Sequence, residues 1–273
     1  MAAEKELGVE GAYSESVQQP EFEAAFRDYA NKGYDIVIGH GSEFGDAALV
    51  VAKEFPNTYF AITNSDVKAA NVAGLDTKNE ESGYIAGFIA GTLTKTKKVG
   101  YVGSMEIVGM LRGAEGFQLG VKAACPDCEA LIAYTGSFDD IAKGKETALA
   151  LYDNGADIIW QYADASGLGV IDAAKAENML VIGMGTDQTS LAPDNMVTST
   201  IQHLGPIIVS IVKEVQDGSF TPNTVRLNGY DTGAYELAPL NKKLVTPEQE
   251  AAIMAVVDQL VAGQIELPHL SGQ

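Results

Sequence analysis

Residues 157–184 read DIIWQYADASGLGVIDAAKAENMLVIGM, and this stretch decides the fold class of the chain. Two short runs rich in β-branched residues, 157–163 and 179–184, enclose an amphipathic stretch of helical character. A strand, a helix and a strand in this order place the two strands parallel in one sheet, because the helix must cross over between them. The stretch therefore predicts an α/β protein with a parallel sheet.

The same alternation of short strands and amphipathic stretches extends over most of the chain. Near the N-terminus, Phe22, Ala25, Phe26 and Tyr29 recur at i, i+3, i+4 and i+7, which indicates a helix whose apolar stripe covers a sheet. Two series of strands are expected, at residues 9–15, 35–39, 58–62 and 71–75, and at 98–104, 130–134, 157–163, 179–184 and 196–202. Two series of this kind predict two lobes, each with its own sheet and core.

A glycine-rich helix separates the two series. Its Gly83, Gly87 and Gly91 lie four residues apart, so one face lacks side chains and is expected to pack closely against a neighbour. Thr246 and Gln249 form a capping-box pattern at the start of the last helix. The expected division assigns residues 1–95 and about 203–228 to the N-terminal lobe, 96–202 and about 229–245 to the C-terminal lobe, and 246–273 to a C-terminal helix and tail.

The overall charge argues against nucleic acid as a partner. The chain has a formal net charge of −19 and a pI near 4.4, whereas a phosphate backbone must be neutralised by clustered Lys and Arg. An anionic membrane surface is disfavoured for the same reason. The sequence contains no apolar run of about 18 residues, so no membrane-spanning helix is expected.

The cysteines and histidines do not form a metal-binding pattern. Cys125 and Cys128 stand alone as a CxxC pair, and His40, His203 and His269 lack the spacing of metal ligands. The CxxC pair is interpreted as a surface loop that is compatible with a disulfide. A redox pair and half of a metal site are the alternatives.

Several long segments carry a family resemblance, among them GAEGFQLGVKAACPD (113–127), TGSFDDIAKGKETALALYDNGADIIWQ (135–161) and VIGMGTDQTSLAPD (181–194). In these segments the chain resembles the basic membrane protein family of ABC-transporter substrate-binding proteins, which includes purine nucleoside receptors. The resemblance covers the chain from near residue 1 to about 240. It implies two Rossmann-like lobes of the type I periplasmic-binding-protein architecture, with a small-molecule ligand in the cleft between them.

The resemblance also implies a biological setting. It predicts a non-enzymatic, monomeric receptor without cofactor or metal, whose partner is an ABC permease in the membrane. It places the protein in the periplasm or at the cell surface as a lipoprotein, with the signal upstream of these residues. A cytoplasmic ligand-sensing regulator with the same fold is the alternative function.

This sequence departs from the family pattern at the expected site. The family's first strand and its Asp-Asn turn have no counterpart, because the chain opens within the first helix at AAEKELG (2–8). Asn64 and Gly185 stand where nucleoside-binding members have carboxylates, although Asp187 is kept, and Gln202 stands where they have a lysine. Since these positions read the ribose in those members, the changes favour a flat, largely neutral heterocycle over an ordinary nucleoside.

The remaining candidates are aromatic rings and polar groups at strand ends. Aromatic faces can sandwich a heterocycle while polar side chains read its edge, although Phe44 and Trp160 also fit a role in the core. The expected ligand-binding residues are Phe44, Asn64, Trp160, Tyr162, Asp164, Gly185, Asp187 and Gln202.

Enzyme motifs are weaker than this pattern. Gly39, Gly41 and Gly45 resemble a dinucleotide fingerprint, but the third glycine falls one place late. Asp139 and Asp140 form an adjacent carboxylate pair, which fits an N-cap of the following helix better than a catalytic pair. The sequence contains no GxSxG motif, and these weak signals leave the expectation of a non-enzymatic protein unchanged.

Overall fold

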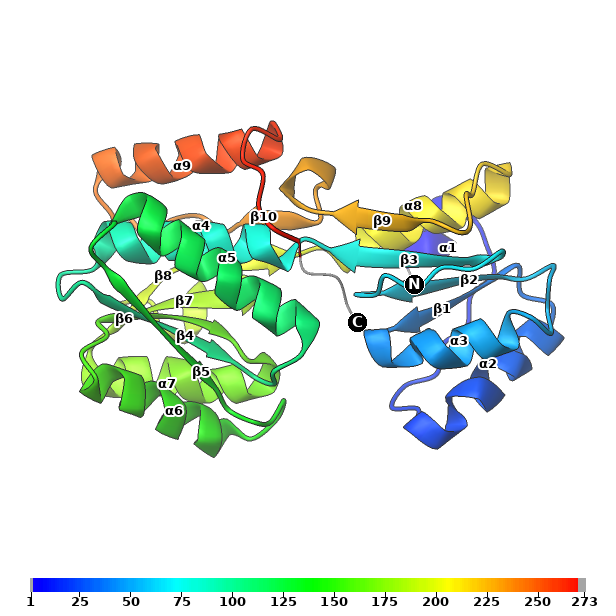
Figure 1. Ribbon diagram of the computed structural model, residues 1–273, viewed down its shortest axis with the longest axis horizontal. Helices are drawn as coiled ribbons and strands as arrows, with labels where there is room; N and C mark the ends of the chain where they lie inside the picture. Colours follow the sequence, from blue (N-terminus) through cyan, green and yellow to red (C-terminus); the bar gives the residue numbers. More distant parts are fainter. Residues whose placement is uncertain (1, 270–273) are drawn as a thin grey trace. The chain divides into compact units, whose positions relative to one another are not determined.

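The computed structural model describes residues 2–269, and the chain forms two compact units (Figure 1). Among the described residues, unit 1 contains residues 2–77 together with Leu204–Asn228, and unit 2 contains Lys78–His203 and residues 229–269. The chain therefore passes from one unit to the other after Thr77, after His203 and after Asn228. Each unit has its own sheet, which confirms the predicted α/β fold with two parallel-sheet lobes.

Unit 1 is built on a four-stranded parallel sheet in the order β1-β2-β3-β9. The helices α2 and α3 pack on β1 and β2 through a core that includes Phe26, Val51 and Phe60, and α8 lies on the other face of the sheet (Figure 1). The strands are β1 (Ile36–His40), β2 (Tyr59–Thr63), β3 (Val72–Thr77) and β9 (Val225–Asn228), and the helices are α1 (Ala2–Leu7), α2 (Phe22–Asn31), α3 (Gly45–Val51) and α8 (Leu204–Asp217).

One expected strand of unit 1 is wrong. Residues 9–15 form no strand, and most of their side chains are exposed. The acidic Glu10 and Glu15 and the small Gly11 leave this stretch with too little apolar surface to join a sheet. Helix α1 precedes this stretch and contacts α8.

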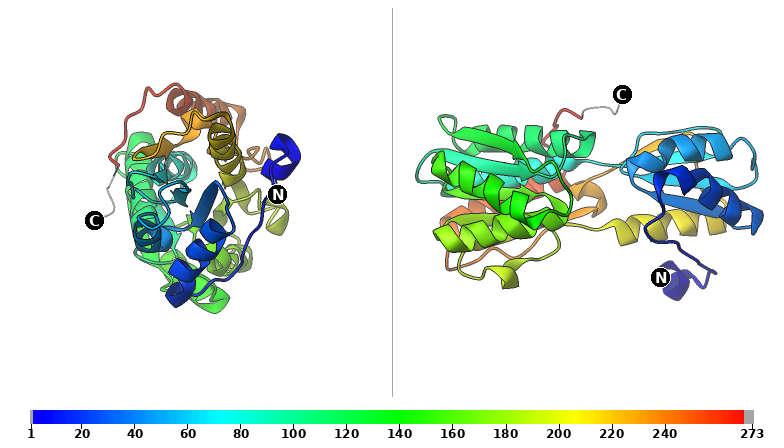
Figure 2. Two further views of the ribbon diagram at one scale, coloured as in Figure 1. Left: turned by 90° about the vertical axis from the view of Figure 1, so that its right-hand side faces the viewer. Right: turned by 90° about the horizontal axis from the view of Figure 1, so that it is seen from below.

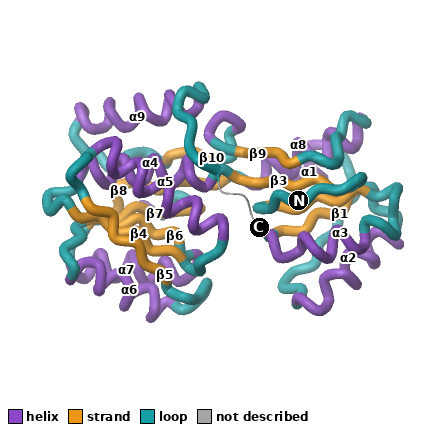
Figure 3. Tube along the Cα trace, viewed as in Figure 1, coloured by secondary structure: helices purple, strands orange, loops and turns teal. Residues whose placement is uncertain are grey.

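Unit 2 contains a six-stranded sheet in the order β10-β8-β7-β6-β4-β5, in which only β10 runs antiparallel. Helices α4 and α5 cover one face of this sheet, and α6 and α7 cover the other (Figures 1 and 3). The strands are β4 (Lys98–Gly103), β5 (Glu129–Tyr134), β6 (Ile158–Tyr162), β7 (Leu180–Gly185), β8 (Met196–Gln202) and β10 (Tyr235–Leu237). The helices are α4 (Asn79–Leu93), α5 (Val108–Ala124), α6 (Ile141–Asp153), α7 (Gly167–Glu177) and α9 (Pro247–Val261).

The core of unit 2 lies between the sheet and these helices. Val102, Ile159 and Val181 from the strands pack against Val170 and Ile171 of α7, and all five are buried. Figure 2 (right) shows the same helix pair, α6 and α7, from below. A sheet covered on both faces explains why its strands read as nearly continuous apolar runs.

The glycine face of α4 belongs to unit 2. A Cβ atom at Gly87 would lie 2.0 Å from the carbonyl oxygen of Phe117, and one at Gly83 would lie 2.1 Å from that of Gly113. The backbones of α4 and α5 are therefore in direct contact, which confirms the expected close packing. This packing corrects the predicted division, which placed residues up to 95 in the first lobe, because α4 follows its helix partner into unit 2.

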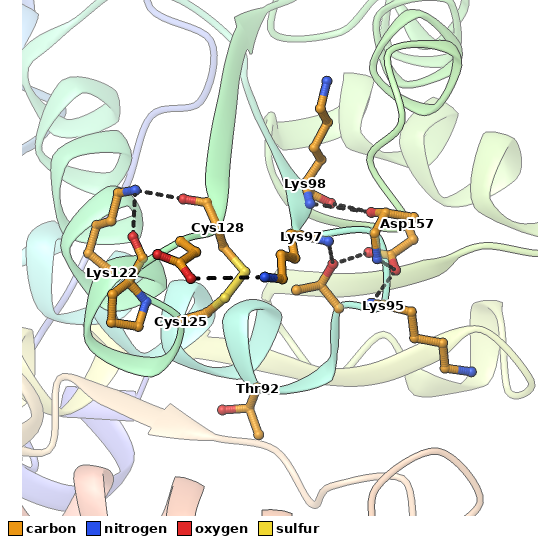
Figure 4. The surroundings of a disulfide bond; sticks show 12 residues. Thr92, Lys95, Lys97, Lys98, Lys122, Cys125, Cys128 and Asp157 are labelled. Carbon is orange, nitrogen blue, oxygen red and sulfur yellow. Dashed lines mark hydrogen bonds and ion pairs between the residues drawn. A yellow bond between two sulfur atoms is a disulfide. The ribbon is translucent and has the colours of Figure 1, made fainter.

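A disulfide joins Cys125 and Cys128 where α5 ends and β5 begins (Figure 4). The Lys122 ammonium donates to the carbonyl oxygens of Pro126 and Cys128 at 3.0 and 2.7 Å and so closes the same turn. Among the interpretations left open for this pair, the structure shows the disulfide. Within residues 2–269, no group of three or more His, Cys, Asp or Glu side chains is placed to hold a metal ion.

Two further local predictions are confirmed. The Asp140 side chain accepts a hydrogen bond from the Lys143 amide at 3.1 Å and caps α6. Thr246 and Gln249 form the reciprocal capping box at the start of α9. None of the helices between residues 2 and 269 combines the length and the apolar character that crossing a bilayer requires.

Candidate functional site

The carboxyl ends of the parallel strands are the natural place for a ligand in each unit, because open α/β sheets bind ligands there. In unit 1 this edge begins with His40 at the end of β1. The His40 ring nitrogen Nδ1 lies 2.8 Å from the Thr63 hydroxyl at the end of β2, and the Gly41 amide donates to the same hydroxyl at 3.1 Å. These bonds fix the turn that follows β1 against the neighbouring strand.

Asn64 follows β2 in the left-handed backbone conformation, with a φ of 52°. Its side-chain oxygen accepts a hydrogen bond from the Thr77 hydroxyl at the end of β3, at 3.1 Å. Its backbone amide donates to the Leu75 carbonyl oxygen at 2.8 Å. Within the described chain the Nδ2 group of Asn64 makes no hydrogen bond, so this donor is available to a ligand.

Phe44 lies in the same region of unit 1, at the end of a 3-10 helix (Ser42–Phe44). Its ring stacks on Phe22 with the centroids 3.8 Å apart and meets the edge of Phe26 at 5.9 Å. The side chain is only partly buried. Phe44 thus packs against the core and keeps part of its ring surface open, which is compatible with either role expected from the sequence.

In unit 2, a hydrogen-bond network around Asn79 connects two of the expected ligand-binding residues, Tyr162 and Gln202. The Tyr162 hydroxyl at the end of β6 donates to the Asn79 side-chain oxygen at 2.6 Å, and the Tyr235 hydroxyl donates to the same oxygen at 2.5 Å. The Gln202 amide at the end of β8 donates to the Tyr235 hydroxyl at 3.2 Å. Burial raises the pKa of Tyr162, so its phenol stays protonated and acts as a donor.

Trp160 lies in the core of unit 2. Its side chain has no exposed surface, its indole nitrogen donates to the Thr200 hydroxyl at 3.3 Å, and its ring packs on Tyr101 and Phe117. The structure therefore supports the core role for Trp160, and Tyr162, whose ring lies 5.2 Å from it, is the aromatic residue nearer the strand end.

Asp164 repeats the geometry of Asn64. It follows β6 in the left-handed conformation with a φ of 50°, and its carboxylate accepts a hydrogen bond from the Ser104 hydroxyl after β4 at 3.2 Å. A non-glycine residue in this conformation costs about 1 kcal/mol. The residue as a whole is exposed, but desolvation of its carboxyl group raises the pKa, and the bond from Ser104 acts in the opposite direction.

The end of β7 supplies the last two candidates. Gly185 has a φ of 91° and no atom within 4 Å of the place where a Cβ would lie. Asp187 is exposed, and its carboxylate accepts hydrogen bonds from the Thr189 amide and hydroxyl at 2.9 and 2.6 Å. These bonds hold the pKa of Asp187 below its usual range, and they commit one carboxylate oxygen to the 3-10 helix Thr189–Leu191.

Sequence reasoning missed Asn79, Tyr235 and Ser104. Asn79 is separated from Tyr162 by 83 residues and from Tyr235 by 156, so no local pattern connects them. The one available signal was position, since Asn79 opens the helix that directly follows the first passage between the units.

Comparison with known proteins identifies the family. The family model described as Bmp, ABC transporter substrate-binding protein PnrA-like, matches residues 1–271. The chain belongs to this family. As a PnrA-like substrate-binding protein it has the type I periplasmic-binding-protein fold and is not an enzyme.

Curated relatives of this PnrA-like protein carry different functional names. This chain is 30% identical over 274 residues to the ABC transporter nucleoside-binding protein BmpA of Lactococcus lactis subsp. cremoris. The alignment covers 94% of this chain and 77% of the relative. This chain is 28% identical over 221 residues to the transcriptional activator protein med of Bacillus subtilis, with 79% and 68% covered.

A solved structure shows the same architecture. The ABC transporter system solute-binding protein from Conexibacter woesei is 28% identical and has a TM-score of 0.77 to this PnrA-like protein. The alignment covers 98% of this chain and 91% of that chain. The similarity therefore extends over both units.

Proposed function

We propose that this PnrA-like protein binds a purine or a related nucleoside- or nucleobase-like heterocycle and delivers it to the permease of an ABC importer. It acts as a monomeric receptor in the periplasm or as a lipoprotein at the cell surface. Each unit offers candidate ligand groups at the carboxyl edge of its own sheet. Ligand binding shifts the protein toward its ligand-bound conformation, and the permease recognises that conformation.

The observation that carries the proposal is that each unit presents an aromatic ring together with a polar side chain near the carboxyl edge of its sheet. Unit 1 offers the partly exposed ring of Phe44 and the amide of Asn64, and unit 2 offers the ring of Tyr162 and the carboxylate of Asp164. Flat aromatic faces bind heterocycles through their apolar area, and a few fixed polar groups read the edge. The nucleoside-binding name of the Lactococcus lactis relative supports the same ligand class.

The groups that stand where a ribose diol would bind are weak hydrogen-bond acceptors in this chain. Gly185 has no side chain, and the side-chain oxygen of Asn64 already accepts a bond from Thr77. Gln202 donates to Tyr235. We therefore place the main recognition on the base.

A thermal-shift series tests the proposal. The protein is unfolded, dialysed free of bound ligand and refolded, and its melting temperature is measured with adenine, adenosine, ribose and glutamate. At 100 times its Kd, a ligand adds about 2.7 kcal/mol of stability, which corresponds to a shift of about 5–10 °C. Adenine is expected to raise the melting temperature. A shift with ribose or glutamate but not with adenine contradicts the proposal, and a shift only with intact nucleosides contradicts the emphasis on the base.

A ligand-sensing regulator is the second candidate, supported by the similarity to the Bacillus subtilis activator. The two functions predict different effects of deleting the gene. A transport receptor is required for uptake of labelled purine at low external concentration, whereas a regulator leaves uptake kinetics intact and changes transcription. We favour transport, because the family model that matches residues 1–271 is described as an ABC transporter substrate-binding protein.

A further inference from the structure

We infer that Asp164 makes this site selective for a ligand that presents a hydrogen-bond donor or a positive charge, and that the carboxyl edge of unit 2 rejects anionic ligands such as phosphorylated nucleotides. The inference rests on the proposed function and specifies its ligand class. A heterocycle with an exocyclic amino group fits this requirement, and one with only carbonyl oxygens at the same edge does not.

The loops at this edge of unit 2 carry a uniform negative charge. Four loops follow β4, β5, β6 and β7, at residues 104–107, 135–140, 163–166 and 186–188. They contain no Lys or Arg, and their acidic residues are Glu106, Asp139, Asp140, Asp164 and Asp187. A ligand phosphate at this edge would meet like charges, which repel at close range.

Three of these carboxylates have evident structural roles. Asp140 caps α6, Asp187 accepts from the Thr189 amide and hydroxyl, and Asp139 accepts from the Ser137 hydroxyl at 2.9 Å. Negative charge at a helix start is stabilised by the free amide groups and the helix dipole, so such residues need no ligand to explain them. Glu106 is exposed at the edge.

Asp164 differs from the other four in its backbone and its surroundings. It alone among them has a positive φ, and its carboxylate is held by the Ser104 hydroxyl. Desolvation raises the pKa of this carboxyl, so its ionised form lacks part of the stabilisation that water gives. A ligand donor restores that stabilisation, whereas a ligand acceptor does not.

The cations near this edge do not offset the acidic loops. Arg112 lies close enough to Tyr162 to act on its pKa, but its side chain is only 3% exposed. Lys143, in the first turn of α6, lies 4.0 Å from the Asp140 carboxylate. Lys78 bridges Glu81 at 3.1 Å and Asp231 at 3.0 Å. Among the residues that the structure describes, these three cations are thus either buried or close to an acid.

Calorimetric titration with matched ligands tests the inference. Adenine and purine differ at one position, where adenine has an exocyclic amino group and purine has a hydrogen atom. Adenosine and its 5′-monophosphate differ by the phosphate. We expect adenine to bind about 10- to 100-fold more tightly than purine, since hydrogen bonds to charged groups have about this effect. We expect the monophosphate to bind at least about 100-fold more weakly than adenosine.

Two variants test whether Asp164 is responsible for the ligand selectivity. Asp164→Asn removes the charge, and Asp164→Gly removes the side chain while accepting the left-handed backbone. Both are expected to bring the ratio of the adenine affinity to the purine affinity close to one. Asp139→Asn is the control, because it removes one charge from a neighbouring loop and is expected to leave the ratio unchanged. If Asp164→Asn does not fold, Asp164→Gly still tests the inference.

The outcomes separate this inference from the proposed function. Equal or tighter binding of purine, comparable binding of the monophosphate, or full selectivity in both Asp164 variants overturns the inference and leaves heterocycle binding intact. If none of the four ligands binds, the proposed function and the inference fail together.

Discussion

Asn64 and Asp164 occupy corresponding places in the two units, with φ angles of 52° and 50°. Each follows a strand, and each side-chain oxygen accepts a hydrogen bond from a hydroxyl at the end of the adjacent parallel strand, from Thr77 and from Ser104 respectively. β3 is the partner of β2, and β4 is the partner of β6. Two strained residues in equivalent positions are more economically explained by a shared binding role than by two separate accidents of folding.

Asn64→Gly is expected to weaken ligand binding about 5- to 10-fold, because it removes one neutral hydrogen-bonding group. Glycine accepts the same backbone conformation, so the fold should persist. Isothermal titration with adenine measures the change. The matched control is Asn223→Gly, an exposed residue with a φ of 60° in the turn before β9, which should leave affinity unaltered. Equal losses in both variants would assign the effect to the backbone.

Asp164→Asn is expected to raise the melting temperature of the unliganded protein while it lowers ligand affinity. Desolvation raises the pKa of this carboxyl in the folded state, so its charge opposes folding at neutral pH. Removing the charge relieves that penalty, as often happens at residues kept for function. Differential scanning calorimetry without ligand measures the shift, and a lower melting temperature would contradict this account.

Ligand affinity is expected to fall on acidification. An ordinary Asp titrates near about 3.9, and the pKa of Asp164 is raised above this value, so its protonation begins at a higher pH. The protonated carboxyl is a poorer acceptor for a ligand donor, and affinity decreases as the pH falls through that pKa. Stability has the opposite sign, because a folded pKa above the unfolded one makes this group favour folding more at low pH. Titrations from pH 7.5 to 5 compare the native protein with Asp164→Asn, whose profile should be flatter.

Trp160→Ala is expected to destabilise unit 2 by about 3–5 kcal/mol, since a fully buried indole leaves a large cavity. Urea unfolding followed by circular dichroism measures the loss. Trp160→Phe keeps most of the packing and should recover more than half of it. A folded Trp160→Ala variant of native stability that no longer binds ligand would return Trp160 to the binding site.

Gly87→Ala is expected to destabilise the α4 and α5 pair by about 2 kcal/mol or more, because the new Cβ would lie 2.0 Å from the Phe117 carbonyl oxygen. Gly205→Ala in α8 is the matched control, since no atom lies within 4 Å of its Cβ position. That change should be neutral or stabilise by about 0.5–1 kcal/mol through the higher helix propensity of alanine. Thermal unfolding of both variants measures the difference, and similar melting temperatures would show that the two helices can separate without cost.

The sequence by itself determined the fold class, most strands, the glycine face of α4 and the two helix caps. These features depend on local periodicity and on residues a few positions apart, such as Asp140 and the Lys143 amide, so they can be read along the chain. The sequence also placed Asn64 and Asp164 at strand ends, where candidate ligand groups belong.

Only the tertiary structure decided which side chains act together. It placed α4 in unit 2, because the glycine face of α4 packs directly against the backbone of α5, and the sequence does not show which segment meets that face. It buried Trp160 and joined Tyr162, Tyr235 and Asn79 at one oxygen atom, although they are far apart along the chain. Contacts of this kind depend on how the sheet orders its strands, and strand order is set by the packing of the whole unit rather than by any local run of residues.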